Sequence, residues 1–354
     1  MSLSKPLLLF LLVLRAPNGI RTRVTAVKGR CPRPLDDGDV LRLGNLTRES
    51  VWGQTRELHL IGYPSNMTNV WVLGSNGMLG SAVNAELLRR EIKFAAITRA
   101  SFGSYQLGSG QDSDFEAISD LEKIFGIPTH VINAVGVVKP RIVETNSESV
   151  LNAIQGNTIF PRSLGGYCES KSVHLIQIAT DCVYSGTKGG YLETDLHDPT
   201  DVYGKTKSLG EISSDHISLI RCSIIGRENE NKYSLVEWVN SQLPDSSING
   251  FTNHNWNGIT TKVFGMIASG LIQSNLDPVG KIHLTPKDKL NKLELVNLIK
   301  NELGRKDIIV NAFEASVVID RTLSTELPGL NTLLWKKAGF ENTPTISEMI
   351  KLGL

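Results

Sequence analysis

Short apolar segments alternate with amphipathic segments between residues 70 and 222. The apolar runs predict strands over Val70–Leu73, Phe94–Thr98, Val131–Val135, His174–Thr180 and Ile217–Cys222. Helical spacing predicts a helix with Leu79, Val83 and Leu87 on its buried face, and further helices over Ser147–Tyr167 and Val202–Ser213. Strands that alternate with helices at short intervals predict a parallel, doubly wound α/β sheet. Ligands bind such a sheet beyond the carboxyl ends of its strands, so polar residues there are candidate site residues.

The first 66 residues differ from the rest in pattern and in charge. They hold 10 Lys and Arg against 5 Asp and Glu, whereas the other residues hold 27 against 31, so the chain's net charge of +1 averages two unlike parts. The apolar run Pro6–Leu14 is shorter than the ~20 residues that span a bilayer. A secretory signal is the alternative. However, Arg15 directly follows the apolar run, and no cleavage site of small residues comes after it. Residues 16–65 show neither helical nor strand periodicity.

We therefore expect residues 1–66 to be an unstructured extension. An upstream start codon assigned in place of Met67 is one explanation for it, because Met67 stands directly before the first predicted strand.

Composition excludes several classes of protein. The even charge balance argues against a nucleic-acid binder held by phosphate neutralisation, and the 40% hydrophobic content argues against disorder of the whole chain. The 4 cysteines form no CxxC pair and no metal-ligand spacing, so we expect no disulfide scaffold and no metal site. These features favour a cytoplasmic protein in a reducing compartment, without a membrane partner. A length of 354 residues allows one large or two ordinary domains.

A glycine-rich loop follows the first predicted strand. Residues 74–80 have the form GxxGxxG, and a helix is expected directly after them. Glycines there allow a tight turn, let a pyrophosphate approach the backbone and let the helix pack closely on the strand, as in Rossmann-type dinucleotide sites. An ordinary tight turn is the alternative for a glycine triplet alone. We expect cofactor contacts from Gly74, Asn76, Gly77, Met78 and Leu79.

Further cofactor contacts are expected where later strands end. Arg99 follows the second strand, where an arginine suits a 2′-phosphate, so NADPH is preferred over NADH; a solvated surface arginine is the alternative. A third short strand is expected before Asp114 and Phe115, and these two residues are expected to contact the edge of the adenine. Val131–Val135 then counts as a fourth strand, which brings Asn133, Ala134 and Val135 near the cofactor.

A tyrosine and a lysine are spaced for acid/base chemistry. Tyr203 and Lys207 lie one helical turn apart, and the Lys207 ammonium is expected to favour ionisation of the phenol. Thr180, at a strand end, adds a hydroxyl that can hold a substrate carbonyl. Together the three residues predict carbonyl reduction, with Tyr203 protonating the forming alkoxide. An exposed tyrosine and a solvated lysine are the alternative for this pair alone.

These motifs resemble those of the extended short-chain dehydrogenase/reductases, with Asn157 in NTIFP as a further match. Within that superfamily the chain most resembles the dTDP-4-dehydrorhamnose reductase family. The resemblance runs from Thr68 to the end of the chain. It is carried by residues 179–186, 191–195, 202–211, 320–324 and 344–350.

The resemblance implies a cofactor domain over residues 67–226. It also implies a smaller sugar-nucleotide domain over residues 227–354, with elements that return to the Rossmann core. It makes Thr180, Tyr203 and Lys207 the catalytic triad, adds Asn157, Tyr203 and Lys207 to the cofactor contacts, and leaves monomer and homodimer open. On the substrate side it points to Asp181, Val183, Tyr184, Ser223 and Thr260.

The chain also departs from the family pattern. Ile224 stands where the family usually has a tryptophan, Cys182 where it has an aromatic residue, and Ser185 where it has an aspartate. Trp256 is expected either to replace the lost contact by stacking on a base or sugar, or to plug the domain interface.

The leading functional expectation is NADPH-dependent reduction of the 4-keto group of a nucleotide-activated deoxysugar in surface polysaccharide biosynthesis. An epimerase or dehydratase of the same superfamily is one alternative, against which Arg99 weighs. A non-catalytic regulatory subunit that binds nucleotide sugars is another, against which the retained triad weighs.

Overall fold

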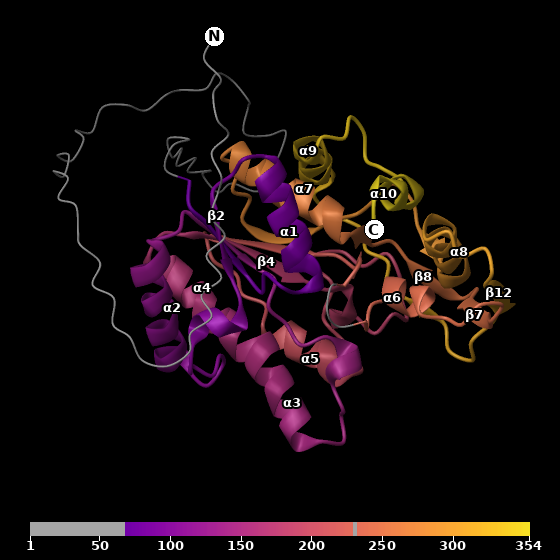
Figure 1. The fold of residues 1–354 in the computed structure, drawn as a ribbon, viewed down its shortest axis with the longest axis horizontal. Helices are drawn as coiled ribbons and strands as arrows, with labels where there is room; N and C mark the ends of the chain where they lie inside the picture. Colours follow the sequence, from indigo (N-terminus) through magenta and orange to yellow (C-terminus); the bar gives the residue numbers. More distant parts are fainter. Residues whose placement is uncertain (1–67, 229–231) are drawn as a thin grey trace, which may run out of the picture. The chain divides into compact units, whose positions relative to one another are not determined.

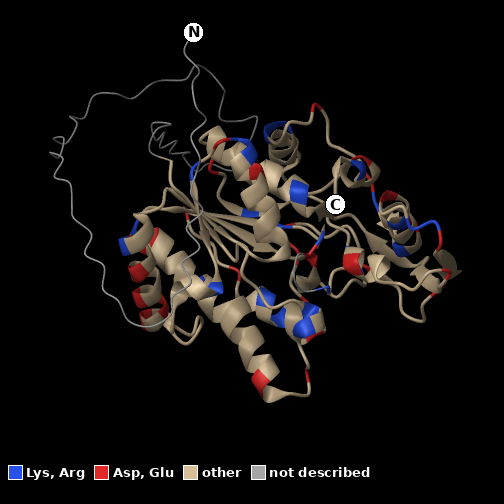
Figure 2. Ribbon diagram, viewed as in Figure 1, with Lys and Arg blue, Asp and Glu red and all other residues tan. Residues whose placement is uncertain are grey.

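The computed structural model describes residues 68–228 and 232–354 (Figure 1). The extension expected over residues 1–66 and the start at Met67 lie outside the described residues. Charged residues of both signs are spread over the described ribbons, with several acidic positions along α2 (Gln111–Phe125) (Figure 2).

A six-stranded parallel sheet forms the centre of the described chain. Its strands run in the order β10-β5-β4-β3-β1-β2. Their bounds are β1 Val70–Leu73, β2 Phe94–Ile97, β3 His130–Asn133, β4 His174–Ala179, β5 Ile217–Arg221 and β10 Gly280–His283. This order confirms the predicted doubly wound sheet. Sequence analysis missed β10, which pairs with β5 although about 60 residues separate them along the chain.

Helices cover both faces of the sheet (Figure 1). In chain order they are α1 Met78–Arg89, α2, α3 Ser147–Ile154, α4 Phe160–Ser170, α5 Val202–Leu209, α6 Leu235–Asn240, α7 Thr261–Gln273, α8 Lys292–Glu302, α9 Pro328–Ala338 and α10 Ile346–Leu352. None of the described helices is long and apolar enough to cross a membrane.

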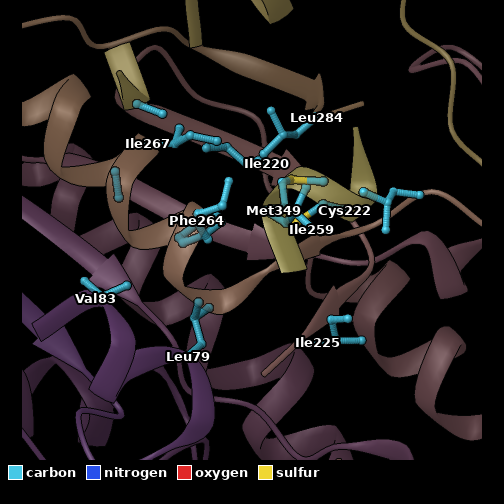
Figure 3. Packing of buried hydrophobic residues seen from close by; sticks show 14 of the residues in the cluster. Leu79, Val83, Ile220, Cys222, Ile225, Ile259, Phe264, Ile267, Leu284 and Met349 are labelled. Atoms are coloured by element: carbon cyan, nitrogen blue, oxygen red, sulfur yellow. The ribbon is translucent and has the colours of Figure 1, made fainter. Parts of the chain in front are cut away.

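Side chains of β1 alternate between two apolar layers. Val70 and Val72 pack with the residues of α1 and α7, whereas Trp71 and Leu73 pack with those of α2 and α4. Figure 3 shows the first layer, in which Leu79, Val83, Phe264, Ile267 and Ile220 lie close together. Side chains that alternate with a period of two show that the strand lies between two apolar layers. Each fully buried aliphatic side chain contributes about 1.5–3 kcal/mol to the stability of the fold.

The third strand that was expected before Asp114 is absent from the described chain. Gly103, Gly108 and Gly110 take positive φ angles of +58°, +77° and +156°, which break any extended run there. Asp114 and Phe115 lie instead in the first turns of α2. The run beginning at His130 is therefore the third strand and not the fourth.

The helix predicted over residues 147–167 is interrupted. A π-helical turn, Gln155–Ile159, separates α3 from α4 and turns Asn157 inward, where it is buried. The helix predicted over residues 202–213 ends earlier, at Leu209. Gly210 follows it, packed against the carbonyl of Asn157.

Smaller sheets lie in the carboxyl-terminal part. One has the order β11-β8-β13, formed by Leu290–Asn291, His254–Trp256 and Ile319–Asp320. Two parallel pairs join β7 (Ser247–Phe251) to β12 (Ile309–Phe313), and β6 (Ile224–Ile225) to β9 (Ile259–Thr260). One apolar cluster runs from the main sheet to Trp256 and Leu295. The domain boundary near residue 226 stays a prediction.

Candidate active site

The glycine-rich loop connects β1 to α1 in a conformation that needs glycine. Gly74 has a φ of +80°, and a Cβ there would lie 2.9 Å from the carbonyl carbon of Ala134. A Cβ on Gly80 would collide with the Gly74 carbonyl. Gly77 caps α1 without a side-chain hydrogen bond, so the first backbone N–H groups of the helix stay open. This is the arrangement that accepts an anionic group at a helix N-terminus.

Residues around the loop differ in exposure. Asn76 and Gly77 are exposed and Met78 is half-buried, whereas the Leu79 side chain packs in the core. Arg99 is exposed at the end of β2 and makes no hydrogen bond or ion pair with the described residues. Its guanidinium is therefore available to a ligand, and its contact with a 2′-phosphate stays a prediction.

The Asp114 side chain does not lie at an open surface. Its side chain is 1% exposed, and one carboxylate oxygen accepts the backbone N–H of Gly108 at 2.7 Å. The Phe115 ring meets Tyr167 edge to face, with 6.3 Å between the centroids. The prediction of an adenine contact by the Asp114 carboxylate is therefore wrong, because the carboxylate is buried beneath the turn that it holds. The contact predicted for Phe115 stays a prediction.

Two asparagines shape the segment that faces the glycine loop. Asn133 accepts the backbone N–H of Val135 at 3.0 Å and donates to Gln177 at 2.8 Å. Asn157 accepts the N–H of Val137 at 2.8 Å and donates to its carbonyl at 2.9 Å. Both amides are thus used within the chain, and they position the backbone of residues 134–137 beside Gly74.

The three predicted catalytic residues come together. Tyr203 and Lys207 lie one turn apart on α5, whose first turn is fixed by Asp201, an N-cap that accepts the N–H of Gly204 at 2.8 Å. Thr180 lies close enough to Tyr203 to lower the pKa of its phenol, against the larger effect of burial. Thr180 also donates to Asp181 and accepts the N–H of Cys182, each at 3.2 Å. The end of β4 and the start of α5 therefore build one site.

Burial sets the protonation states in this site. It raises the pKa of the Tyr203 phenol above its usual value, and nearby Cys182 and Asp181 add to the shift, whereas Thr180 opposes it. Burial also lowers the pKa of Lys207 to about 8, and its ammonium donates to the Ile178 carbonyl at 3.2 Å. The largest causes of the shift in the Tyr203 pKa do not include Lys207, so the expected effect of its ammonium on the phenol stays a prediction. Tyr203 is a neutral phenol at pH 7, the form that donates a proton.

Cys182 is a thiol in the same surroundings. Burial and, to a smaller extent, the charge of Asp181 raise its pKa to about 12. The thiol is therefore not a nucleophile at neutral pH.

Two residues predicted to bind substrate are core residues. Val183 and Tyr184 are both 0% exposed and pack with Tyr191 and Leu323. The Tyr184 hydroxyl donates to the Leu192 carbonyl at 3.0 Å. The predicted substrate contacts of these side chains are wrong, because the chain after Thr180 turns into a small core of its own.

The other residues predicted to contact the substrate differ in burial and in their contacts. Thr260 is 1% exposed and caps α7, so a substrate contact by its side chain is wrong. Trp256 is 4% exposed and its indole N–H donates to the Ser223 hydroxyl at 2.7 Å. The structure favours Trp256 as a packing residue over a stacking platform. Ser223 is half-buried beside it, and Asp181 is buried beside Thr180.

Sequence analysis missed two cations near the site. The charges of Lys292 and Arg321 both act on the carboxylate of Asp181. Arg321 belongs to the segment 320–324 that carried the family resemblance, which was the only signal for it. Lys292 begins α8, and no local pattern in the sequence places it beside Asp181.

The parallel sheet, the glycine loop and the Thr, Tyr and Lys trio define a protein of the extended short-chain dehydrogenase/reductase class. Residues 67–237 match the family model described as the RmlD substrate binding domain. Over residues 67–237 the chain is similar to the dTDP-4-dehydrorhamnose reductase family within that class.

Similar proteins include a reductase and a subunit of methionine adenosyltransferase 2. The chain is 29% identical over 147 residues to a dTDP-4-keto-6-deoxy-D-glucose reductase of Streptomyces niveus. The aligned region covers 41% of this chain and 47% of the relative. It is 29% identical over 148 residues to methionine adenosyltransferase 2 subunit beta of Rattus norvegicus, covering 40% of this chain and 41% of that protein. The chain thus spans about half the length of these relatives.

Among solved structures, dTDP-4-dehydrorhamnose reductase from Bacillus anthracis in complex with NADP has a TM-score of 0.63 and 17% identity. The match covers 80% of this chain and 98% of that chain. At this identity, the likeness establishes the fold.

Proposed function

We propose that the protein reduces the 4-keto group of a nucleotide-activated deoxysugar with a nicotinamide cofactor, NADPH in preference to NADH. The observation that carries the proposal is that Thr180, at the end of β4, interacts with Tyr203 on α5, with Lys207 one turn further along that helix. The reductase of Streptomyces niveus supports the substrate class. A role in surface polysaccharide biosynthesis stays a prediction from the family resemblance.

The glycine loop fits a dinucleotide cofactor. The loop backbone packs tightly at Gly74 and Gly80, where a Cβ would collide with Ala134 and with the Gly74 carbonyl, and the N-terminus of α1 has no side-chain cap. The exposed Arg99 at the end of β2 suits a 2′-phosphate, and the similar structure from Bacillus anthracis is a complex with NADP. Both observations support NADPH.

The protein's residues account for the proton in the reaction. When bound, the cofactor supplies a hydride to the carbonyl carbon. Thr180 donates a hydrogen bond that orients the carbonyl oxygen, and Tyr203 donates its phenolic proton to that oxygen as negative charge develops. The Lys207 ammonium then stabilises the phenolate that Tyr203 becomes. Burial of all three groups strengthens these interactions.

A panel of 4-keto sugar nucleotides tests the reaction. The full chain is incubated with NADPH and each substrate, and NADPH absorbance is followed. Oxidation of NADPH that requires a 4-keto sugar supports the proposal, and a panel without turnover contradicts it.

A second candidate is a non-catalytic regulatory subunit. The observation that favours it is the identity of 29% to methionine adenosyltransferase 2 subunit beta, equal to the identity to the reductase. The retained Thr180, Tyr203 and Lys207 weigh against it, because a binding protein needs no proton donor. A chain that binds NADPH but turns over no keto sugar would favour this second candidate.

A further inference from the structure

Arg221, which ends β5, lies at the centre of a buried polar cluster. Its Nε and Nη2 donate to the Glu211 carboxylate at 2.7 and 2.6 Å, and its Nη1 donates to the Tyr184 hydroxyl at 2.9 Å. Nη2 and Nη1 also lie 2.8 and 3.1 Å from the Nε2 atoms of His197 and His283, respectively. Arg221 therefore contacts side chains from four separate segments of the chain.

The hydrogen bonds assign the proton of each histidine to one nitrogen. A guanidinium has only donors, so Nε2 of His197 and Nε2 of His283 accept from Arg221 and carry no proton. The ring proton of each histidine is then on Nδ1. In His197 this proton is donated to the Ser208 hydroxyl at 2.7 Å, and in His283 to the Ser324 carbonyl at 2.8 Å. Both rings are therefore neutral in this arrangement.

His197 connects the helix that carries the proton donor to the segment after β4. Its Nδ1 partner, Ser208, directly follows Lys207 on α5. The His197 ring also meets the Tyr184 ring edge to face, with 5.6 Å between the centroids. Movement of this ring therefore acts on α5 through Ser208.

The loop that carries His197 is itself held in place. The Asp198 carboxylate accepts the backbone N–H and the hydroxyl of Ser185, at 2.7 and 2.6 Å. Asp201, at the end of the loop, caps α5 by accepting the N–H of Gly204 at 2.8 Å. Because the loop is anchored beside the helix, the ring has a defined position relative to α5.

The charges around His197 balance while its ring is neutral. Arg221 and Glu211 form a buried ion pair, and the His197 Nε2 lies 3.6 Å from the Glu211 carboxylate. Burial is the largest effect on the ring, and it lowers the pKa of His197 below its usual value of 6.5. The charge of Glu211 opposes this lowering of the pKa, whereas Arg221, Lys281 and His283 add to it. The ring is therefore neutral at neutral pH and takes up a proton in acid.

Two further acids near the cluster have partners elsewhere. Glu193 accepts the backbone N–H of His283 at 3.0 Å, and Asp195 pairs with the Lys188 ammonium at 2.6 Å. Among residues 68–228 and 232–354, neither acid forms a hydrogen bond or an ion pair with His197. Glu211 is therefore the acid that a protonated His197 ring would engage.

A proton on Nε2 of His197 disrupts the cluster. Arg221 loses an acceptor, and its Nη2 then faces a second donor. Two cations share the Glu211 carboxylate in a buried position, which is costly, so the ring or the carboxylate has to move. Because the ring bonds Ser208 and Glu211 lies just beyond α5, either movement displaces the helix.

We propose that His197 is a positioning residue for the reduction: its neutral ring holds α5 in place, and its protonation displaces α5 and slows turnover. This inference rests on the proposed function and deepens it. His197 acts through Ser208 and Glu211 and not by touching the substrate. The displaced helix carries Tyr203 and Lys207, so the proton donor and the ammonium both lose their positions. The charge of Glu211 also acts to raise the pKa of Lys207 against burial, so its displacement weakens the ammonium.

The pH dependence of kcat tests this role. In His197→Gln the amide can accept from Arg221 and donate to Ser208, but it does not titrate. His197→Ala removes both hydrogen bonds. His254→Gln is the matched control, because His254 is half-buried and its Nε2 lies 3.0 Å from the Val317 carbonyl, outside the cluster.

The assay follows NADPH oxidation with a 4-keto sugar nucleotide from about pH 7.5 to about pH 5, where histidines titrate. Over this range, the kcat of the wild type and of His254→Gln should fall at least about threefold more than that of His197→Gln. At about pH 7.5, His197→Gln should stay within about threefold of the wild type, whereas His197→Ala should lose about tenfold in kcat. Urea unfolding of each variant at both pH values checks that the chain is folded in the assay.

Hydrogen exchange reports on α5 without substrate. The amides of residues 202–210 are followed by mass spectrometry in the wild type and in His197→Gln at the same pH, so that intrinsic exchange rates cancel. We expect equal protection at about pH 7.5, and at least about threefold faster exchange in the wild type at about pH 5. Residues 261–273, which form α7, are the internal control and should exchange equally in both proteins.

The outcomes separate this inference from the proposed reaction. Equal α5 exchange in the wild type and His197→Gln at about pH 5, or a His197→Ala variant with the kcat of the wild type, overturns the positioning role. If keto sugars are still reduced in that case, the reaction stands without it. If α5 exchange depends on His197 but no keto sugar is reduced, the coupling of His197 to α5 stands and the proposed reaction fails.

Discussion

Arg221 is a buried arginine with several hydrogen-bond partners. It ends β5 and is 0% exposed. Its guanidinium donates to Glu211 at 2.7 and 2.6 Å, and to the Tyr184 hydroxyl at 2.9 Å. Glu211 lies just beyond α5, so the pair ties the helix that carries Tyr203 and Lys207 to the sheet.

We predict that Arg221→Met strongly destabilises the protein. The substitution fills similar space but leaves the Glu211 carboxylate, whose side chain is 7% exposed, without its counter-charge. Breaking one side of a buried pair costs about 3–5 kcal/mol. That is a large share of the roughly 5–15 kcal/mol by which proteins are stable. At ~2–4 °C per kcal/mol for a protein of this size, the melting temperature should fall by ~6–20 °C.

Urea unfolding of the full chain, followed by circular dichroism, measures the loss. Lys123→Met is the control, because Lys123 and Asp120 form a surface pair with side chains 75% and 43% exposed and should contribute less than about 1 kcal/mol. The double variant Arg221→Met, Glu211→Leu should recover part of the stability, since it leaves no unpaired charge between these positions. An Arg221→Met variant within about 1 kcal/mol of the wild type would refute this reasoning.

Three further predictions concern the cofactor side and the proton donor. Gly80→Ala should lower both thermal stability and NADPH affinity, because its Cβ would meet the Gly74 carbonyl; unchanged fluorescence titration with NADPH would contradict the role of the loop. Arg99→Ala should raise the KM for NADPH far more than the KM for NADH, and equal effects on both would remove the 2′-phosphate role. Because burial lowers the pKa of Lys207 to about 8, its ammonium is present below that pH and is lost above it. The kcat/KM should therefore fall as pH rises through about 8, and a value that stays constant to pH 10 would show that the charge of Lys207 is not needed.

Local patterns in the sequence were enough to predict the elements that carry the glycine loop and the candidate catalytic residues. The strand before Gly74, the stripe of Leu79, Val83 and Leu87, and the spacing of Tyr203 and Lys207 all arise from interactions within a few residues. Such interactions leave a periodic trace in the sequence.

Features that depend on distant segments left no such trace. The strand β10 joins the sheet only through its pairing with β5, and Lys292 meets Asp181 only because α8 begins beside β8. Tyr184 was predicted at the substrate from the family resemblance, whereas its contacts with Arg221 and Tyr191 draw it into the interior. The direction of the Tyr203 pKa also depended on burial, which spacing along a helix does not reveal.

The central claim is that Tyr203 donates the proton in a ketone reduction. The most direct test compares NADPH oxidation by the wild-type chain and Tyr203→Phe, with a 4-keto sugar nucleotide as substrate. Tyr105→Phe serves as the control, because its phenol bonds Asp120 at 3.0 Å on α2, outside the site. The account predicts that Tyr203→Phe loses about 10²–10⁴-fold in kcat while its Kd for NADPH and its melting temperature stay the same. A Tyr203→Phe variant that turns over as fast as the wild type would contradict it.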